Sequence, residues 1–218
     1  AAMTAGLFDL YQDNRTHGIP NLITPDLLLV SYSLIREQSA SRTEKQQLVP
    51  LFQQMLTGVG AGLEARQEAD PLLPKARAYI RLISALLEGK EPAALDIPGM
   101  AEEWKLLREA DTLTTSPLFG VPVDYSQLQP RGRYTRTPEM QQYFRAVRYA
   151  GTVHFFSQSS PATGISPEKA AELTQLARLL TREIQATPTT RAAYEGFLQR
   201  LAWEYGKPVD LSARDYGT

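Results

Sequence analysis

The sequence predicts an all-α fold, an irregular bundle of about seven to eight helices with one long ordered loop. Apolar side chains recur at spacings of three and four residues along most of the chain, which is the period of a helix with one buried face. Four segments also begin with a capping residue followed by proline, a favourable helix start. Alternation of apolar and polar residues, typical of strands, is limited to a few residues near 118–123.

The helix starts are the clearest local signal. A Ser, Thr or Asp oxygen can accept an N–H of the first turn, and proline at the first helical position forfeits no hydrogen bond. The four pairs are Thr24-Pro25, Asp70-Pro71, Thr137-Pro138 and Ser166-Pro167. Thr43 with Gln46 has the pattern of a capping box and predicts a further start.

Apolar stripes then place the helices along the chain. They run through residues 48–63, 72–87, 140–155, 173–184 and 194–205. Segment 26–36 differs, because its apolar residues cover every side of a helical wheel. A helix that is apolar all round is usually buried. We therefore expect this helix at the centre of the bundle.

Composition is that of a folded globular protein, and the length fits one large domain or two small ones; we expect a single helical domain over residues 1–218. Hydrophobic residues make up 43% and charged residues 22% of the chain, ordinary values for a globular protein. A net charge of -1 and a pI near 6.2 argue against a nucleic-acid partner. The longest apolar run is far shorter than a bilayer requires, so we expect no transmembrane segment, and we identify no signal peptide.

Few residues offer metal or cofactor chemistry. The chain has no cysteine and two histidines, His17 and His154, in separate elements, so we expect no metal site. The string Gly58, Gly60, Gly62 ends a helix instead of opening one after a strand. It therefore indicates close helix packing or a helix terminus, and we expect no bound cofactor. Acidic residues such as Glu102-Glu103 have the pattern of solvated charge on a helix face.

A stretch of about 25 residues without a period, 112–136, is the leading site candidate, because long ordered loops often carry function. Five arginines against two acids give residues 121–165 a local charge of +3. The predicted ligand-binding residues are Tyr125, Arg131, Arg133, Tyr134 and Arg136, and Asp124 is a weak catalytic candidate. In the alternative interpretation, the arginines pair with acids of the scaffold and the tyrosines cover the core.

Two motifs resemble a known family. The first is GIPNLITPDLLL, residues 18–29, and the second is VDYSQLQPRGRYTR, residues 123–136. Together they resemble the proteins called domain of unknown function 3160 over roughly the first 150 residues. The resemblance implies an exported, often lipid-anchored, helix-rich protein of bacteria or archaea, periplasmic or on the cell surface. It also implies that this chain is an N-terminal part of a longer protein or a short divergent member.

The resemblance brings no activity, and it implies histidines where this chain has Val30, Ser33 and Arg133. These departures favour a binding or scaffold module for an envelope component, a protein or a peptide, with no enzymatic activity. Such a module predicts a shallow contact surface. The alternative is a hydrolase acting on a cell-envelope polymer, with an acid-arginine site on loop 112–136. It predicts a deep cleft in which two carboxylates converge.

Overall fold

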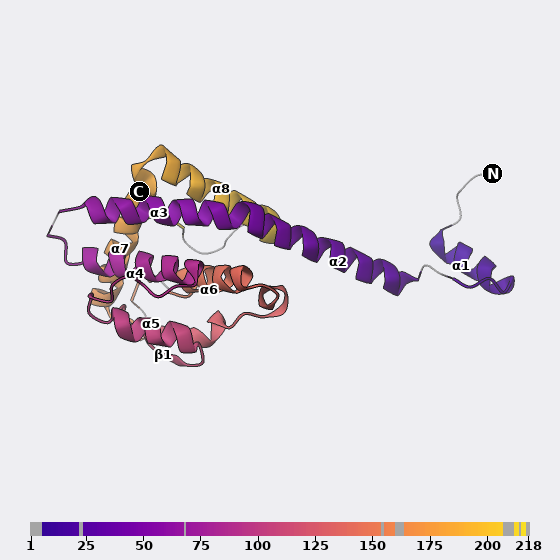
Figure 1. Ribbon diagram of the computed structural model, residues 1–218, viewed down its shortest axis with the longest axis horizontal. Coiled ribbons are helices and arrows are strands. Elements are labelled where there is room, and N and C mark those ends of the chain that lie inside the picture. The colour runs from indigo at the N-terminus through magenta and orange to yellow at the C-terminus, as the bar shows by residue number, and fades with distance from the viewer. Residues whose placement is uncertain are drawn as a thin grey trace. The chain divides into compact units, whose positions relative to one another are not determined.

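A computed structural model of the chain confirms the all-α prediction (Figure 1). It describes residues 6–21, 24–67, 69–153, 155–159, 164–206, 212–213 and 215–216. The chain divides into two compact units, residues 1–42 and 43–218. The single domain predicted for residues 1–218 stays a prediction.

The smaller unit holds helix α1 (Leu7–Thr16) and most of helix α2 (Pro25–Thr43). Asp9 accepts the N–H of Gly6 over 3.0 Å at the start of α1. At the start of α2 the hydroxyl of Thr24 accepts the N–H of Leu27 over 3.2 Å. The helix start predicted at Thr24-Pro25 is therefore confirmed.

The predicted central position of segment 26–36 is wrong. The large apolar side chains of this part of α2 are between 47% and 70% exposed; they are Leu27, Leu28, Leu29, Val30, Tyr32, Leu34 and Ile35. An apolar pattern on all sides of a helix says that burial would be favourable, but it does not supply a covering element. Within the part of the chain that the structure describes, no element covers these side chains.

The larger unit is built around helix α4 (Leu73–Glu88), which contacts helices α3 (Val49–Ala65), α6 (Pro138–Thr152) and α7 (Pro167–Ala186). Helix α8 (Pro188–Tyr205) contacts α3 and α7, and helix α5 (Met100–Glu109) lies on the far side of α4 from α3 (Figure 1). The buried residues of α4 lie on several sides of the helix: Leu73, Ala76, Ala78, Tyr79, Ile80, Leu82, Ile83, Ala85 and Leu86. The central helix of the bundle is therefore α4, and not the predicted segment 26–36.

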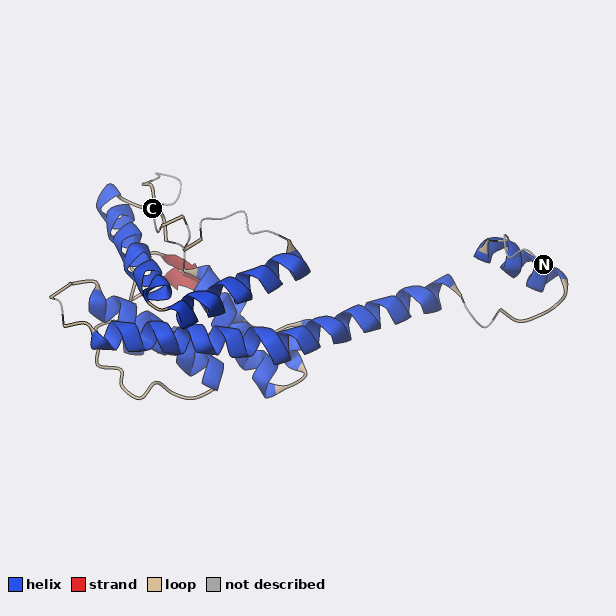
Figure 2. Cartoon of the chain, turned by 90° about the horizontal axis from the view of Figure 1, so that it is seen from above, coloured by secondary structure: helices blue, strands red, loops and turns tan. Residues whose placement is uncertain are grey.

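Segment 112–136 is ordered, as expected, and has local structure of its own. Strands β1 (Leu113–Thr115) and β2 (Pro122–Asp124) form an antiparallel pair in which Thr114 faces Val123 (Figure 2). The 3-10 helices η2 (Tyr125–Leu128) and η3 (Gly132–Thr135) follow. The hairpin and η2 bury side chains in the core, so this segment packs as part of the bundle.

The predicted helix starts have mixed outcomes. Thr137 accepts the N–H of Met140 at the start of α6, and Ser166 accepts the N–H of Lys169 at the start of α7, so both are confirmed. Asp70 accepts the N–H of Leu72 over 2.8 Å, but this caps a turn and α4 begins at Leu73. A further start of the same kind, which the sequence analysis did not name, is Thr187-Pro188 of α8.

The capping box predicted at Thr43 is wrong. Thr43 has helical backbone angles and accepts no capping hydrogen bond. The π-helical turn η1 (Glu44–Leu48) follows it directly, and α3 begins at the next residue. A π-helical turn inserted in a helix is frequently found at functional sites, and here it positions the carboxylate of Glu44.

The glycine string of α3 is a packing surface, as predicted. A Cβ atom at Gly58 would overlap the hydroxyl of Thr190 on α8, and one at Gly62 would overlap the carboxylate of Glu183 on α7. These two glycines, one helical turn apart, let α3 approach both neighbours closely. In the described part of the chain, no helix is long and apolar enough to cross a membrane.

Candidate functional site

Asp124, the weak catalytic candidate, ends β2 and caps η2. Its Oδ1 accepts the backbone N–H of Ser126 over 3.1 Å and the Ser126 hydroxyl over 2.6 Å. Its Oδ2 accepts the side-chain amide of Gln127 over 3.0 Å. The hydrogen bonds from Ser126 and Gln127 lower the pKa of Asp124. This carboxylate is therefore ionised at neutral pH and holds the turn in place.

Tyr125 belongs to a buried group of hydroxyls around Glu103, which we call the Glu103 cluster. Glu103, on α5, accepts hydrogen bonds from Ser116 (2.5 Å), Tyr125 (2.7 Å) and Tyr149 (3.0 Å). Burial and the neighbouring Glu103 charge raise the pKa of Tyr125 and Tyr149. The cluster joins α5, segment 112–136 and α6, and it gives Tyr125 a place in the core.

Arg133 and Tyr134 meet the buried Glu44 of η1 in a second group, the Glu44 cluster. Arg133 donates to both oxygens of Glu44, from Nη2 over 2.7 Å and from Nε over 3.2 Å. The hydroxyls of Tyr134 and Tyr205 donate to the same carboxylate over 2.6 and 2.8 Å. Burial, together with Glu44, raises the pKa of both tyrosines. Two-point pairing with a carboxylate is the geometry that arginine favours.

The remaining predicted residues lie at the surface. Arg131 donates to Gln127 over 3.2 Å, and its charge contributes to the lowered pKa of Asp124. Arg136 follows η3 and is exposed. The structure therefore divides the predicted residues between the Asp124 turn, the Glu103 cluster, the Glu44 cluster and the surface, and does not bring them to one cleft. Their binding and catalytic roles stay predictions.

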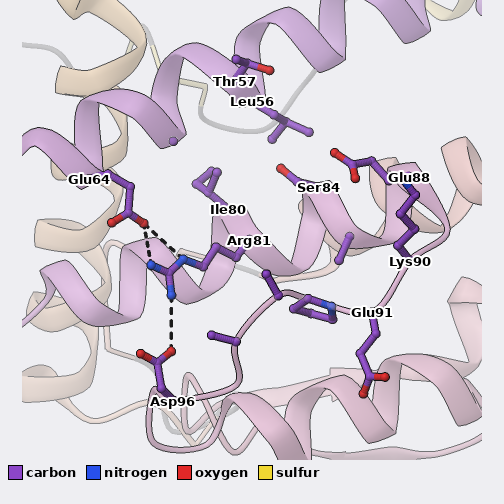
Figure 3. A pocket seen from close by; sticks show the side chains of 15 residues that line it. Leu56, Thr57, Glu64, Ile80, Arg81, Ser84, Glu88, Lys90, Glu91 and Asp96 are labelled. Atoms are coloured by element: carbon purple, nitrogen blue, oxygen red, sulfur yellow. Dashed lines mark hydrogen bonds and ion pairs between the residues drawn. The ribbon is translucent and has the colours of Figure 1, made fainter.

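A hollow of about 640 Å³ lies elsewhere, between α3, α4 and the connection that follows α4 (Figure 3). Its apolar lining comes from Leu56, Ile80, Ala85, Pro92, Ala93 and Ala94. Its charged lining is four acids, Glu64, Glu88, Glu91 and Asp96, and two cations, Arg81 and Lys90. We call this site the α3–α4 hollow. It combines an apolar surface with an excess of two negative charges.

Ion pairs hold one end of the α3–α4 hollow. Arg81 of α4 donates to Oε1 of Glu64 on α3 from Nε (3.1 Å) and Nη2 (2.7 Å), and from Nη1 to Asp96 over 3.4 Å (Figure 3). Arg77 donates to the carbonyl oxygens of Leu63 and Arg66, where α3 ends. These contacts fix the distance between the helices. At the other end, Glu88 and Glu91 form no such pairs in the described residues.

The chemistry of the α3–α4 hollow suits recognition better than acid catalysis. All four of its carboxylates belong to exposed residues. A carboxyl that serves as a general acid is usually desolvated. Among the residues that the structure describes, no three His, Cys, Asp or Glu side chains gather as a metal site would require.

A family model described as protein of unknown function (DUF3160) matches residues 2–218. The chain belongs to this family. It matches no curated protein and no solved structure. The match extends the two motifs of the sequence analysis over nearly the whole chain, and the family description states no activity.

In this DUF3160 chain, sequence reasoning missed the two buried acids that organise the clusters. The prediction that Glu103 is solvated charge is wrong, because its side chain is fully buried. Its position was the available signal, since it lies three residues after Met100 and four before Leu107, both buried. Glu44 lies four residues before the buried Leu48 in the same way.

Proposed function

We propose that the chain is a non-catalytic binding module whose α3–α4 hollow receives a peptide segment carrying apolar and basic side chains. The observation that supports this proposal is the composition of the hollow, an apolar lining together with four acids against two cations. Protein interfaces commonly combine an apolar centre with a polar rim. Because Arg81 is already paired with Glu64 and Asp96, the acids at the opposite end are the ones a basic partner would meet.

The geometry gives less support to the hydrolase alternative. Asp124 caps η2, whereas Arg133 is engaged by Glu44, so the acid and the arginine of the supposed site have different partners. Among the described residues, the carboxylates with a shifted pKa all shift downward: Asp124, Glu139, Glu168 and Glu172. A general acid needs the opposite shift.

The test is titration of the full chain with a fluorescent peptide of alternating lysine and leucine, at low and at high salt. We expect saturable binding that weakens with salt, because exposed charges are screened. Glu88→Gln combined with Glu91→Gln, which neutralises the acids at the end opposite Arg81, should weaken binding several-fold. Glu195→Gln, which removes one exposed charge from α8, is the control and should leave binding unchanged. Binding that is equal in the double variant and the parent would reject the α3–α4 hollow as the site.

We also infer that the protein acts outside the cytoplasm, in the periplasm or at the cell surface, with a lipid anchor as in the proteins it resembles. The support is the resemblance of its two motifs to an exported family. Fractionation of the source cells tests this inference directly. Recovery of the natural protein from the cytoplasm alone would reject it.

A further inference from the structure

A second hollow, of about 390 Å³, lies where the end of α4 meets α5 and α6. Its polar lining consists of Lys90, Glu91, Trp104, Arg108, Gln142 and Arg145. We call it the α5–α6 hollow. Unlike the α3–α4 hollow, it is rich in positive charge, with three cations against one carboxylate. The local excess is two positive charges.

The cations of the α5–α6 hollow are unpaired in the described part of the chain. Several other basic residues of the bundle have carboxylate partners, as Arg81 has in Glu64 and Arg133 in Glu44. Lys90, Arg108 and Arg145 form no ion pair and no side-chain hydrogen bond there. Like charges held in one hollow repel one another unless an anion joins them.

Two donors at this hollow are buried and lack acceptors. Trp104 is only 8% exposed, and its Nε1–H has no hydrogen-bond partner among the residues that the structure describes. The Nε–H of Arg145 is likewise buried without a partner. Buried N–H groups are nearly always bonded in native proteins, so two orphaned donors at one hollow require an explanation. A bound ligand with several hydrogen-bond acceptors would explain both donors.

We propose that the α5–α6 hollow binds a doubly charged oxyanion of the phosphate or sulfate type. Such a group carries several acceptor oxygens and the charge that matches the local excess. Arginine is well matched to such an anion, because the N–H groups of its planar guanidinium can donate to two oxygens of the same anion. The volume suits a single anionic group with its substituent and is too small for a polymer face. The proposal does not depend on the peptide site, although Lys90 and Glu91 line both hollows, because Trp104, Arg108 and Arg145 line only the α5–α6 hollow of the two.

The indole N–H of Trp104 reports on this site. The chain has two tryptophans, and Trp203 is 79% exposed on α8, so Trp203→Phe leaves Trp104 as the sole indole. We would follow the ¹H–¹⁵N signal of Trp104 in this variant during titration with inorganic phosphate, inorganic sulfate or acetate. Sodium chloride keeps the ionic strength constant. We expect a saturable shift with phosphate, with sulfate or with both, which identifies the preferred oxyanion, and a weak response to acetate.

Variants decide whether the shift comes from the α5–α6 hollow. Arg145→Gln should weaken binding about tenfold or more, since it removes a charged hydrogen-bond donor. Arg108→Gln changes an exposed residue, so it preserves the fold and should also weaken binding. Arg148→Gln is the control, because it removes the same charge from α6 beside Phe144, away from the hollow. An unmoved Trp104 signal, an equal response to acetate, or equal binding in all three variants would overturn the proposal.

Discussion

The hydroxyl of Tyr134 donates to Glu44 over 2.6 Å, although 90 residues separate the two in the chain. Arg133 and Tyr205 reach the same carboxylate, so three segments meet at the first residue of η1. A buried carboxylate surrounded by one cation and two hydroxyls is stable only while its partners remain. The Glu44 cluster therefore fastens segment 112–136 and the end of α8 to the turn before α3.

Replacing Arg133 tests this fastening role. Arg133→Gln leaves Glu44 buried without its cation, which should lower the free energy of unfolding by about 3 kcal/mol. The measurement is urea denaturation followed by circular dichroism. Arg131→Gln, two residues earlier and exposed, should leave the midpoint unchanged. A stable Arg133→Gln protein would show that the pair contributes little.

Replacing Glu103 tests the second cluster. Glu103→Ala deprives Ser116, Tyr125 and Tyr149 of their acceptor in the core. Because each buried donor left unsatisfied costs about 1–3 kcal/mol, the combined loss of stability should be at least about 3 kcal/mol. Thermal unfolding provides the measurement. The matched variant Glu102→Ala, in the same turn but exposed, should melt at the parent temperature, and similar losses for the two would contradict the cluster.

The glycines of α3 allow a comparison within one helix. Gly62→Ala places a methyl group against Glu183, whose carboxylate is buried and paired with Arg66, and should destabilise by about 1–3 kcal/mol. Gly60→Ala meets only Ile80, at 3.6 Å, and should be neutral or stabilising by up to about 1 kcal/mol because alanine favours helices. Chemical denaturation of both variants compares them. A larger loss of stability in Gly60→Ala than in Gly62→Ala would contradict the close approach of α3 and α7.

Acid should weaken the bundle partly through Glu172. Burial opposes ionisation of this residue, but hydrogen bonds and charges from Lys169 and Lys75 outweigh it, so its pKa lies below the ordinary 4.5. A pKa lowered by folding contributes stability above pH 4.5 that is lost as the pH falls through the folded value. Urea midpoints at several pH values below 6 should therefore fall less steeply in Glu172→Gln than in the parent. Parallel curves would exclude a contribution from Glu172.

Because the apolar side chains of α2 are exposed, we expect this helix to tolerate charged substitutions. Ile35 is 70% exposed, so Ile35→Lys should change the free energy of unfolding by less than about 0.5 kcal/mol. Ile83→Lys makes the same change at a buried position of α4 and should prevent stable folding. Thermal melting of the two proteins is sufficient to compare them. Large losses at both positions would restore a buried location for α2.

The fold class could be predicted because periodicity and capping are local properties. Thr137, Ser166 and Thr24 each accept an N–H three residues ahead, which the pairs with proline indicate directly. The central helix could not be predicted in this way. Burial depends on what lies opposite a helix, so segment 26–36 of α2 is exposed although it is apolar on every side, whereas α4 is covered by neighbouring helices.

The candidate site shows the same division between local and distant effects. That Arg133 and Tyr134 have specific partners could be anticipated from their residue types. Glu44 as that partner could not, because no local pattern links it to position 133. The α3–α4 hollow lies between two helices that follow one another in the chain, and the α5–α6 hollow lies between the end of α4, α5 and α6, so in both the charges become neighbours only after folding.

The Glu103 cluster also restricts how this family can change. Its carboxylate and the three hydroxyls come from α5, segment 112–136 and α6, and each is needed to satisfy the others. Substituting one member leaves a buried hydrogen-bond donor or acceptor without its partner. We therefore expect relatives to keep the whole set or to replace all of it together. In a family alignment, a leucine at position 103 should accompany phenylalanines at 125 and 149, and chimeras that mix the two solutions should fold poorly.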